Sequence, residues 1–179
     1  MKVFVGFVLL LFFTACLKSE QSKKPLVSNF IKSEIERLSK EKPRVIKIAT
    51  LNSKADTIIT DSLDWKRELN IFLMNDLDSS QLVNYTMSDL FSNSGNENED
   101  WHRVYIAKNP EEKIQQVQTV TIGNTLLSRI EIIIQKKHEL FTYYKKLIYD
   151  TKTGYEISGS QDIKFVVGIN YSVKVNYEK

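Results

Sequence analysis

The last segment of the chain alternates between apolar and polar side chains. Every second residue from 163 to 177 is apolar: Ile163, Phe165, Val167, Ile169, Tyr171, Val173, Val175 and Tyr177. A strand has a side-chain period of two, so a slip of one residue would expose the whole set. At about 3.3 Å per residue this strand would run roughly 50 Å, longer than usual. We therefore expect a bend or bulge at Gly168, the alternative being a plain glycine that faces solvent.

Further β-rich runs precede this segment. They are "WHRVYIAKN", "KIQQVQTVTI", "TLLSRIEIIIQ", "ELFTYYKKLIYD" and "YEIS", separated by turn signals at Asn109-Pro110, Gly123-Asn124, Lys136-Lys137-His138 and Thr151 to Gly154. Nearer the N-terminus, "RVIKIATLNSKADTIIT" indicates a hairpin that turns at Asn52-Ser53-Lys54. Short strands joined by turn residues are typical of an antiparallel meander.

Two segments have helical periodicity. Apolar residues at 27, 31, 35 and 38 predict an amphipathic helix near 28–40, which Ser28 can cap and which Pro43 ends. A second apolar stripe predicts a helix near 63–77, with oxygen acceptors at its start. We expect an α+β fold in which both helices pack on an antiparallel meander. Some strands are apolar on both faces, so the sheet is either covered by these helices or curved into a partial barrel around a ligand.

The N-terminus has the pattern of an export signal. Lys2 precedes the apolar run Val3 to Phe13, which is too short to cross about 30 Å of hydrocarbon as a helix. The residues Phe13-Thr14-Ala15-Cys16 then resemble the lipobox of bacterial lipoproteins, in which the cysteine is acylated and becomes the mature N-terminus. Phe13 stands where leucine is commoner. An ordinary secretion signal with an incidental cysteine is the alternative.

Cysteine usage supports the lipid anchor. Cys16 is the only cysteine of the chain, and acylation would remove an odd thiol from an oxidising compartment. We expect a signal peptide over 1–15, the lipidated Cys16 with a flexible tether over 16–26, and a single domain over 27–179. The expected location is the cell envelope, most simply the outer membrane, on its periplasmic side or surface. The formal net charge is +3, and the basic residues are interspersed with acidic ones. This distribution argues against nucleic acid as a partner.

The sequence offers little catalytic chemistry. It has no GxSxG, HExxH or phosphate-binding glycine motif, so we expect no enzyme, no catalytic residues, no cofactor and no metal site. Glu97, Glu99, Asp100 and His102 share one polar segment and could bind a hard cation, although a solvated acidic loop is the simpler interpretation. His138 lies in a predicted turn, where a solvated histidine is expected.

The remaining hypotheses concern binding. Tyrosines at 143, 144, 149, 155, 171 and 177 suit interfaces or ligand mouths, and they equally suit half-buried sheets. We expect a lipid-anchored envelope protein that acts as a non-enzymatic binding module, with the membrane and another envelope protein as partners. The alternative is a carrier of a lipid or other apolar small molecule in a curved-sheet cavity.

Two stretches resemble a known group of proteins. "TDSLDWKRELNIFLMN" from Thr60 and "GYEISGSQDIKF" from Gly154, together with Cys16, are similar to segments of small uncharacterised lipoproteins of Bacteroidota. In that group a helix with an acidic-Trp pattern follows a first hairpin, and a "GY.I.G.Q" turn precedes the last strand. The resemblance implies a lipoprotein and no particular activity, so it assigns no functional residues.

Overall fold

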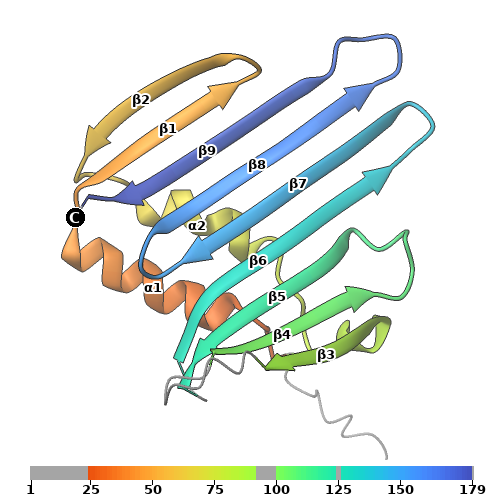
Figure 1. The fold of residues 1–179 in the computed structure, drawn as a ribbon, viewed down its shortest axis with the longest axis horizontal. Coiled ribbons are helices and arrows are strands. Elements are labelled where there is room, and N and C mark those ends of the chain that lie inside the picture. The colour runs from red at the N-terminus through yellow and green to blue at the C-terminus, as the bar shows by residue number, and fades with distance from the viewer. Residues whose placement is uncertain (1–23, 92–99, 124–125, 179) are drawn as a thin grey trace, which may run out of the picture.

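The computed structural model describes residues 24–91, 100–123 and 126–178. This part of the chain folds into one nine-stranded antiparallel sheet and two α-helices, which confirms the predicted α+β class (Figure 1). The strand order is β2-β1-β9-β8-β7-β6-β5-β4-β3. The strands are β1 (Val45–Leu51), β2 (Lys54–Thr60), β3 (Tyr85–Phe91), β4 (Asp100–Ala107), β5 (Ile114–Ile122), β6 (Leu126–Lys137), β7 (Phe141–Asp150), β8 (Gly154–Ile163) and β9 (Ile169–Tyr177).

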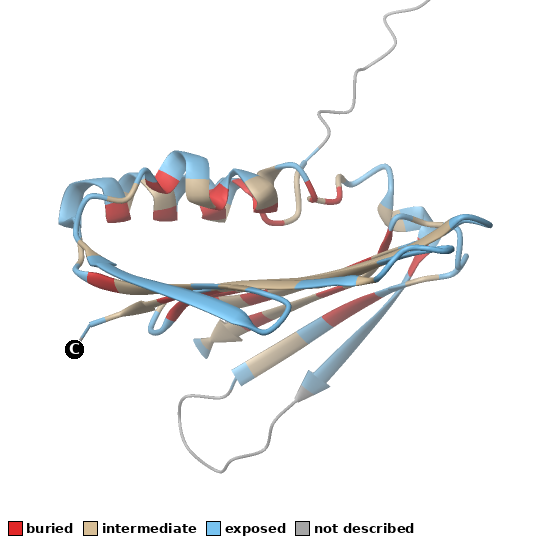
Figure 2. Cartoon of the chain, turned by 90° about the horizontal axis from the view of Figure 1, so that it is seen from above, coloured by how far each residue is buried: buried red, intermediate tan, exposed pale blue. Residues whose placement is uncertain are grey.

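Both helices lie on the same face of the sheet. They are α1 (Ser28–Glu41) and α2 (Trp65–Leu73), and a short 3-10 turn, η1 (Leu82–Asn84), leads into β3. Figure 2 shows the helices as one layer and the sheet as the second, with buried positions where the layers meet. We call the face toward the helices the inner face. The chain passes from β2 at one sheet edge, through α2, to β3 at the other edge.

The core fills the space between helices and sheet. The largest fully buried side chains are Val27, Ile31 and Leu38 of the α1 segment, Trp65, Leu69, Phe72 and Leu77 of the α2 segment, and Ile130, Ile132, Ile134, Leu147 and Tyr149 of β6 and β7. The described sheet does not close into a barrel, so helix packing explains the apolar inner face of its central strands. Burial of apolar area is the main favourable contribution to such a fold.

The start of α1 is capped from a distance. Ser28 does not cap it: the N-cap position is Val27, without a side-chain cap of its own, so that prediction is wrong. Instead, Asp76 accepts hydrogen bonds from the backbone N–H groups of Val27 at 3.0 Å and Ser28 at 2.8 Å. A carboxylate at this end also complements the helix dipole. Asp76 therefore connects the chain after α2 to the start of α1.

The second helix is shorter than the periodicity predicts. Asp64 caps its start by accepting from the N–H of Arg67 at 3.1 Å, as the sequence indicates. The helix ends at Leu73 rather than near 77, because the side chain of Asn75 donates to the carbonyl of Ile71 at 2.8 Å and the chain then turns toward α1. Leu77 is still buried, so the apolar stripe continues past the end of the helix.

The final alternating segment is two strands and not one. It covers the end of β8 at Ile163, a turn, and then β9 from Ile169. Gly168 is the last residue of that turn segment and lies close to the side chain of Asp162, and the chain reverses between the two strands instead of bending within one. The prediction of one long strand is wrong because Phe165 and Val167 continue the alternation through an exposed turn. The odd-numbered residues of β9 do lie inward, and Val175 is fully buried.

Candidate functional site

Two neighbouring tyrosines of the sheet hold the two helices. Tyr149 of β7 and Tyr155 of β8 are direct partners in the antiparallel register, so their side chains emerge side by side on the inner face. The Tyr149 hydroxyl donates to the carboxylate of Glu34 on α1, and the Tyr155 hydroxyl donates to that of Glu68 on α2. Each helix is thus held to the sheet by a hydrogen bond between a tyrosine and a glutamate.

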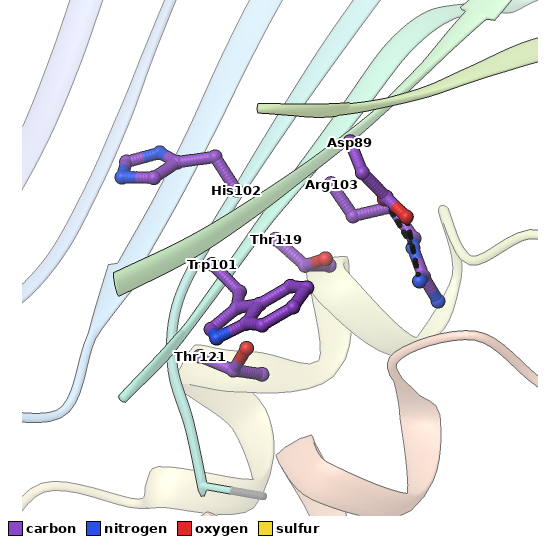
Figure 3. Close-up of a pocket in the computed structure, with 6 residues that line it drawn as sticks. All are labelled: Asp89, Trp101, His102, Arg103, Thr119 and Thr121. Atoms are coloured by element: carbon purple, nitrogen blue, oxygen red, sulfur yellow. Dashed lines mark hydrogen bonds and ion pairs between the residues drawn. The ribbon is translucent and has the colours of Figure 1, made fainter. Parts of the chain in front are cut away.

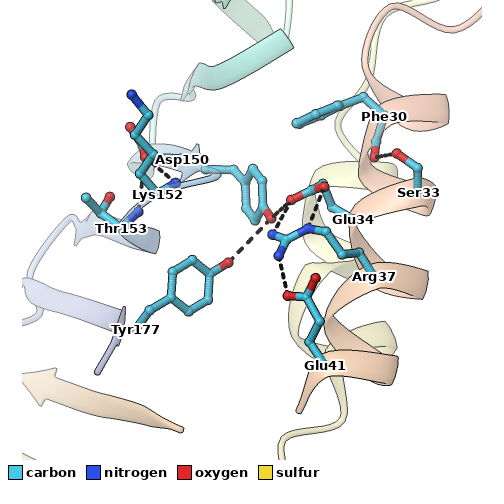
Figure 4. Close-up of polar contacts among 10 residues, drawn as sticks. Phe30, Ser33, Glu34, Arg37, Glu41, Asp150, Lys152, Thr153 and Tyr177 are labelled. Atoms are coloured by element: carbon cyan, nitrogen blue, oxygen red, sulfur yellow. Dashed lines mark hydrogen bonds and ion pairs between the residues drawn. The ribbon is translucent and has the colours of Figure 1, made fainter. Parts of the chain in front are cut away.

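The Glu34 carboxylate is the centre of the first network (Figure 4). It also accepts from Arg37 at 2.7 and 3.1 Å, and Arg37 reaches Glu41 one turn further at 2.6 Å. The hydroxyl of Tyr177 lies 3.5 Å from that of Tyr149. Although burial alone would raise the pKa of Glu34, the hydrogen bonds from Arg37 and Tyr149 outweigh it and lower that pKa.

The second network lies under α2. Lys47 of β1 contacts the other oxygen of Glu68 at 2.6 Å, which completes a chain of lysine, carboxylate and tyrosine. Burial, together with the nearby Glu68 carboxylate, raises the pKa of Tyr155, and burial likewise raises that of Tyr149. Both phenols therefore remain protonated donors, and we assign these two networks to stability and helix placement.

The Glu34 network predicts a loss of stability in acid. The pKa of Glu34 in the folded state lies below its ordinary value of 4.5. The contribution of the ionised carboxylate to stability is therefore fully present above pH 4.5 and is lost as the pH falls through the folded-state pKa. Urea unfolding from neutral pH to about pH 3 should show stability falling with pH. The variant Glu34→Gln should be less stable at neutral pH and should lose less on acidification. An unchanged pH slope in this variant would contradict the assignment.

A cleft on the inner face is the candidate binding site (Figure 3). It has a volume of about 300 Å³ and is lined by the side chains of Asp89, Trp101, Arg103, Thr119 and Thr121, while His102 borders it as part of β4 with its side chain turned away. The register places Trp101 opposite Thr121, and Arg103 opposite both Asp89 and Thr119. These residues belong to the same side of β3, β4 and β5 as the core residues Tyr105 and Val117.

Alternation along β4 and β5 produces this site. On the inner face the side chains change from Tyr105 and Val117, which are in the core, to Arg103 and Thr119 and then to Trp101 and Thr121. Successive residues point to opposite faces, so His102 projects away from this group, as Figure 3 shows. His102 instead forms a hydrogen bond through Nδ1 with Gln118 at 3.2 Å.

A bidentate ion pair forms one wall of the cleft. Arg103 Nε lies 2.7 Å from Asp89 Oδ1, and Nη2 lies 3.0 Å from Oδ2. The hydrogen bond from Arg103 holds the pKa of Asp89 below its ordinary range. Both side chains are partly exposed, so this surface pair contributes little to stability. It does present fixed donors and acceptors beside the Trp101 ring.

The arrangement suits binding more than proton transfer. Trp101 contributes an aromatic ring, Thr119 and Thr121 contribute hydroxyls that can donate or accept, and Arg103 and Asp89 contribute charged hydrogen-bonding groups. An ionised Asp89 that is held by arginine accepts hydrogen bonds but is a weak base at neutral pH. The cleft therefore combines stacking with directional hydrogen bonds.

The sequence-predicted site residues do not come together. Cys16, Glu97 and Glu99 lie outside the described residues. Asp100 is exposed at the start of β4, and His102 is on the outer face, bonded to Gln118. Among the residues that the structure describes, no group of three or more His, Cys, Asp or Glu side chains could hold a metal ion. His138 lies in the β6–β7 turn and stacks on Phe141 at 5.2 Å.

The tyrosines fall into several environments. Tyr149 and Tyr155 are buried, whereas Tyr143, Tyr171 and Tyr177 are half-buried on the inner face. Tyr144 is half-buried on the outer face. Lys145 lies over the rings of Tyr143 at 5.2 Å and Tyr171 at 6.0 Å. Most of these tyrosine side chains thus pack within the sheet or contact the helices.

Comparison with known proteins gives no relative. No protein-family model, no curated protein and no solved structure matches the chain. The resemblance to Bacteroidota lipoproteins therefore stays a prediction. In the described part of the chain, no helix has the length and apolar character needed to cross a membrane.

Proposed function

We propose that this chain is a lipid-anchored binding module of the cell envelope, and that the cleft on β3–β5 binds a saccharide. The predicted anchor at Cys16 supports the location. The observation that carries the ligand class is the grouping of Trp101, two threonine hydroxyls and the Arg103–Asp89 pair around about 300 Å³ of open space. This volume lies at the lower end for small-molecule sites.

A sugar ring matches these groups chemically. One face of a pyranose ring is rich in C–H groups and can stack on an indole ring, while its hydroxyls donate and accept around the rim. Arg103 and Asp89 provide donors and acceptors at fixed spacing, and Thr119 and Thr121 can adapt their hydroxyl hydrogens. Because the pair is neutral overall, the cleft favours an uncharged polar ligand over an anion.

The binding role is non-enzymatic in this proposal. Asp89 stays ionised beside Arg103, so it is suited to accepting hydrogen bonds from hydroxyls. The carrier alternative stays a prediction without support from a particular observation. A ligand between the helices and the sheet would compete with the side chains of Phe72, Ile132 and Leu147, which fill that space.

Replacing Trp101 tests the proposal. Titration calorimetry with neutral gluco-, manno-, galacto- and N-acetylglucosamine oligosaccharides should detect binding to the parent chain. Trp101→Ala should weaken it by about tenfold to a hundredfold, because the loss of an aromatic contact costs roughly 1.5–3 kcal/mol. His102→Ala is the matched control: it is the adjacent residue of the same strand, yet it projects from the other face.

Two outcomes would contradict the saccharide site. In the first, none of the oligosaccharides binds the parent chain. In the second, His102→Ala weakens binding as much as Trp101→Ala, which would show that the effect comes from disturbance of β4. Equal melting temperatures of the two variants would establish that both remain folded.

A further inference from the structure

One end of the sheet carries a cluster of exposed apolar side chains. Phe165 is 93% exposed and Val167 is 86% exposed, both in the β8–β9 turn. The cluster, which we call the apolar tip, comprises Leu51, Leu140, Ile163, Phe165, Val166, Val167 and Ile169. Exposed large apolar groups are unremarkable singly, whereas a contiguous set marks an interaction surface.

Three turns bring the apolar tip together. They join β1 to β2, β6 to β7 and β8 to β9, and all lie at the same end of the sheet (Figure 1). Asn52 donates from its backbone to the carbonyl of Asn170 at 2.7 Å, which ties the first turn to β9. Lys164 donates to the carbonyl of Leu140 at 2.9 Å, which ties the second turn to the third. The three turns that carry the apolar tip are thus tied to neighbouring parts of the same sheet end.

The charges around the apolar tip are mostly positive. Segments 51–54, 136–141 and 161–169 contain the four lysines Lys54, Lys136, Lys137 and Lys164, against the two acidic residues Glu139 and Asp162. Lys164 Nζ lies 5.4 Å from the centre of the Phe165 ring, so its aliphatic stem follows the apolar surface. An excess of lysine around exposed apolar groups complements an anionic lipid surface.

Some backbone N–H and C=O groups of the apolar tip form hydrogen bonds with one another. Val166 donates to the carbonyl of Ile163 at 3.0 Å, and Lys164 donates to Leu140. Unsatisfied backbone groups are costly to move out of water, and these internal bonds reduce that cost. The turn can therefore enter a region of low water content without first losing its structure.

From these observations the geometry points to insertion of the apolar tip into the interfacial layer of an anionic lipid bilayer. The β8–β9 turn projects beyond the ends of its strands (Figure 1), and it carries the most exposed side chains of the tip, Phe165 and Val167. A fluid bilayer accepts such a projection without a complementary pocket, while the lysines contact anionic headgroups. This contact is separate from the predicted acyl anchor and from the saccharide cleft, and it would fix the orientation of the domain on the membrane.

Tryptophan quenching tests this inference in the full-length chain. The variant Phe165→Trp is reconstituted in phosphatidylcholine vesicles that contain phosphatidylglycerol and brominated lipid. Its fluorescence, corrected for that of the parent chain, should shift to the blue and be quenched at least about threefold more than that of Leu126→Trp. Leu126 is the matched control because it is also exposed, at 66%, but lies at the far end of β6, about 36 Å along that strand at 3.3 Å per residue.

The charge contribution has its own test. Replacing Lys136, Lys137 and Lys164 by glutamine should reduce the quenching of Phe165→Trp in anionic vesicles and leave it unchanged in phosphatidylcholine alone. If Phe165→Trp is not quenched, or if Leu126→Trp is quenched equally, the tip does not insert and the inference is wrong. A tip that remains in water would indicate a protein partner. Neither result affects saccharide binding at Trp101.

Discussion

Tyr149→Ala is expected to lower the free energy of unfolding by about 3–5 kcal/mol, the usual cost of truncating a large buried aromatic residue. Tyr149 is fully buried, and its ring lies between Phe30 at 5.9 Å and Phe72 at 6.1 Å. Its hydroxyl donates to Glu34. The substitution therefore leaves a cavity at the junction of both helices with β7, and it removes a donor from a buried carboxylate.

Tyr149→Phe separates these two contributions. It retains the ring and removes only the hydroxyl, so we expect a loss of about 1–3 kcal/mol in urea unfolding. The difference between the two variants then measures the packing of the ring. Equal destabilisation by both would contradict the account, because it would mean that the ring contributes nothing beyond its hydrogen bond.

The second large effect concerns the anchor. Cys16→Ser is expected to abolish labelling of the chain by a fatty-acid analogue, because Cys16 is the only thiol that can accept an acyl glycerol group. The loss should be complete, since the sequence has no other cysteine that could be acylated. Labelling in the native host, followed by gel fluorescence, measures it.

Thr14→Ser is the control for the anchor. It keeps a small residue two positions before Cys16, so labelling should persist. Absence of label from the parent chain, or continued labelling of Cys16→Ser, would contradict lipidation. This test is independent of membrane contact by the apolar tip, because it detects the covalent group and not the location of the chain.

Local periodicity predicts most elements of the fold. The stripes around Ile31 and Leu69 each give a helix, and the alternating runs give the antiparallel meander. Contacts between distant segments are not predicted. The pairing of β1 with β9 brings the first hairpin to the last strand, and Asp76 caps a helix far away in sequence. Neither contact leaves a periodic signal.

The segmentation of the last strand shows a limit of alternation. Phe165 and Val167 have the parity and the apolar character of inward-facing strand residues, although they lie in a turn and are exposed. A pattern of side chains cannot distinguish burial in a core from exposure at an interaction surface, because both favour the same residue types. Here Phe165 and Val167, which follow the alternation but are exposed, mark the apolar tip.

The cleft could not be predicted because it depends on register. Asp89, Arg103 and Thr119 come from three strands, and only the pairing of β3, β4 and β5 places them together. The one local signal is the change on the inner face of β5 from Val117 to Thr119 and Thr121, which ends the apolar series. This change indicates a binding cleft only when the strand register is known, because the register places Trp101 opposite Thr121.

The indole N–H signals of the two tryptophans give the most direct test of the binding site. Trp65 is the first residue of α2 and is buried, whereas Trp101 is half-buried and lines the cleft. In a two-dimensional ¹H–¹⁵N spectrum of the full-length chain, addition of a bound oligosaccharide should move the Trp101 signal and leave that of Trp65 in place. A stationary Trp101 signal at saturating oligosaccharide would show that the ligand binds elsewhere and that the cleft is not its site.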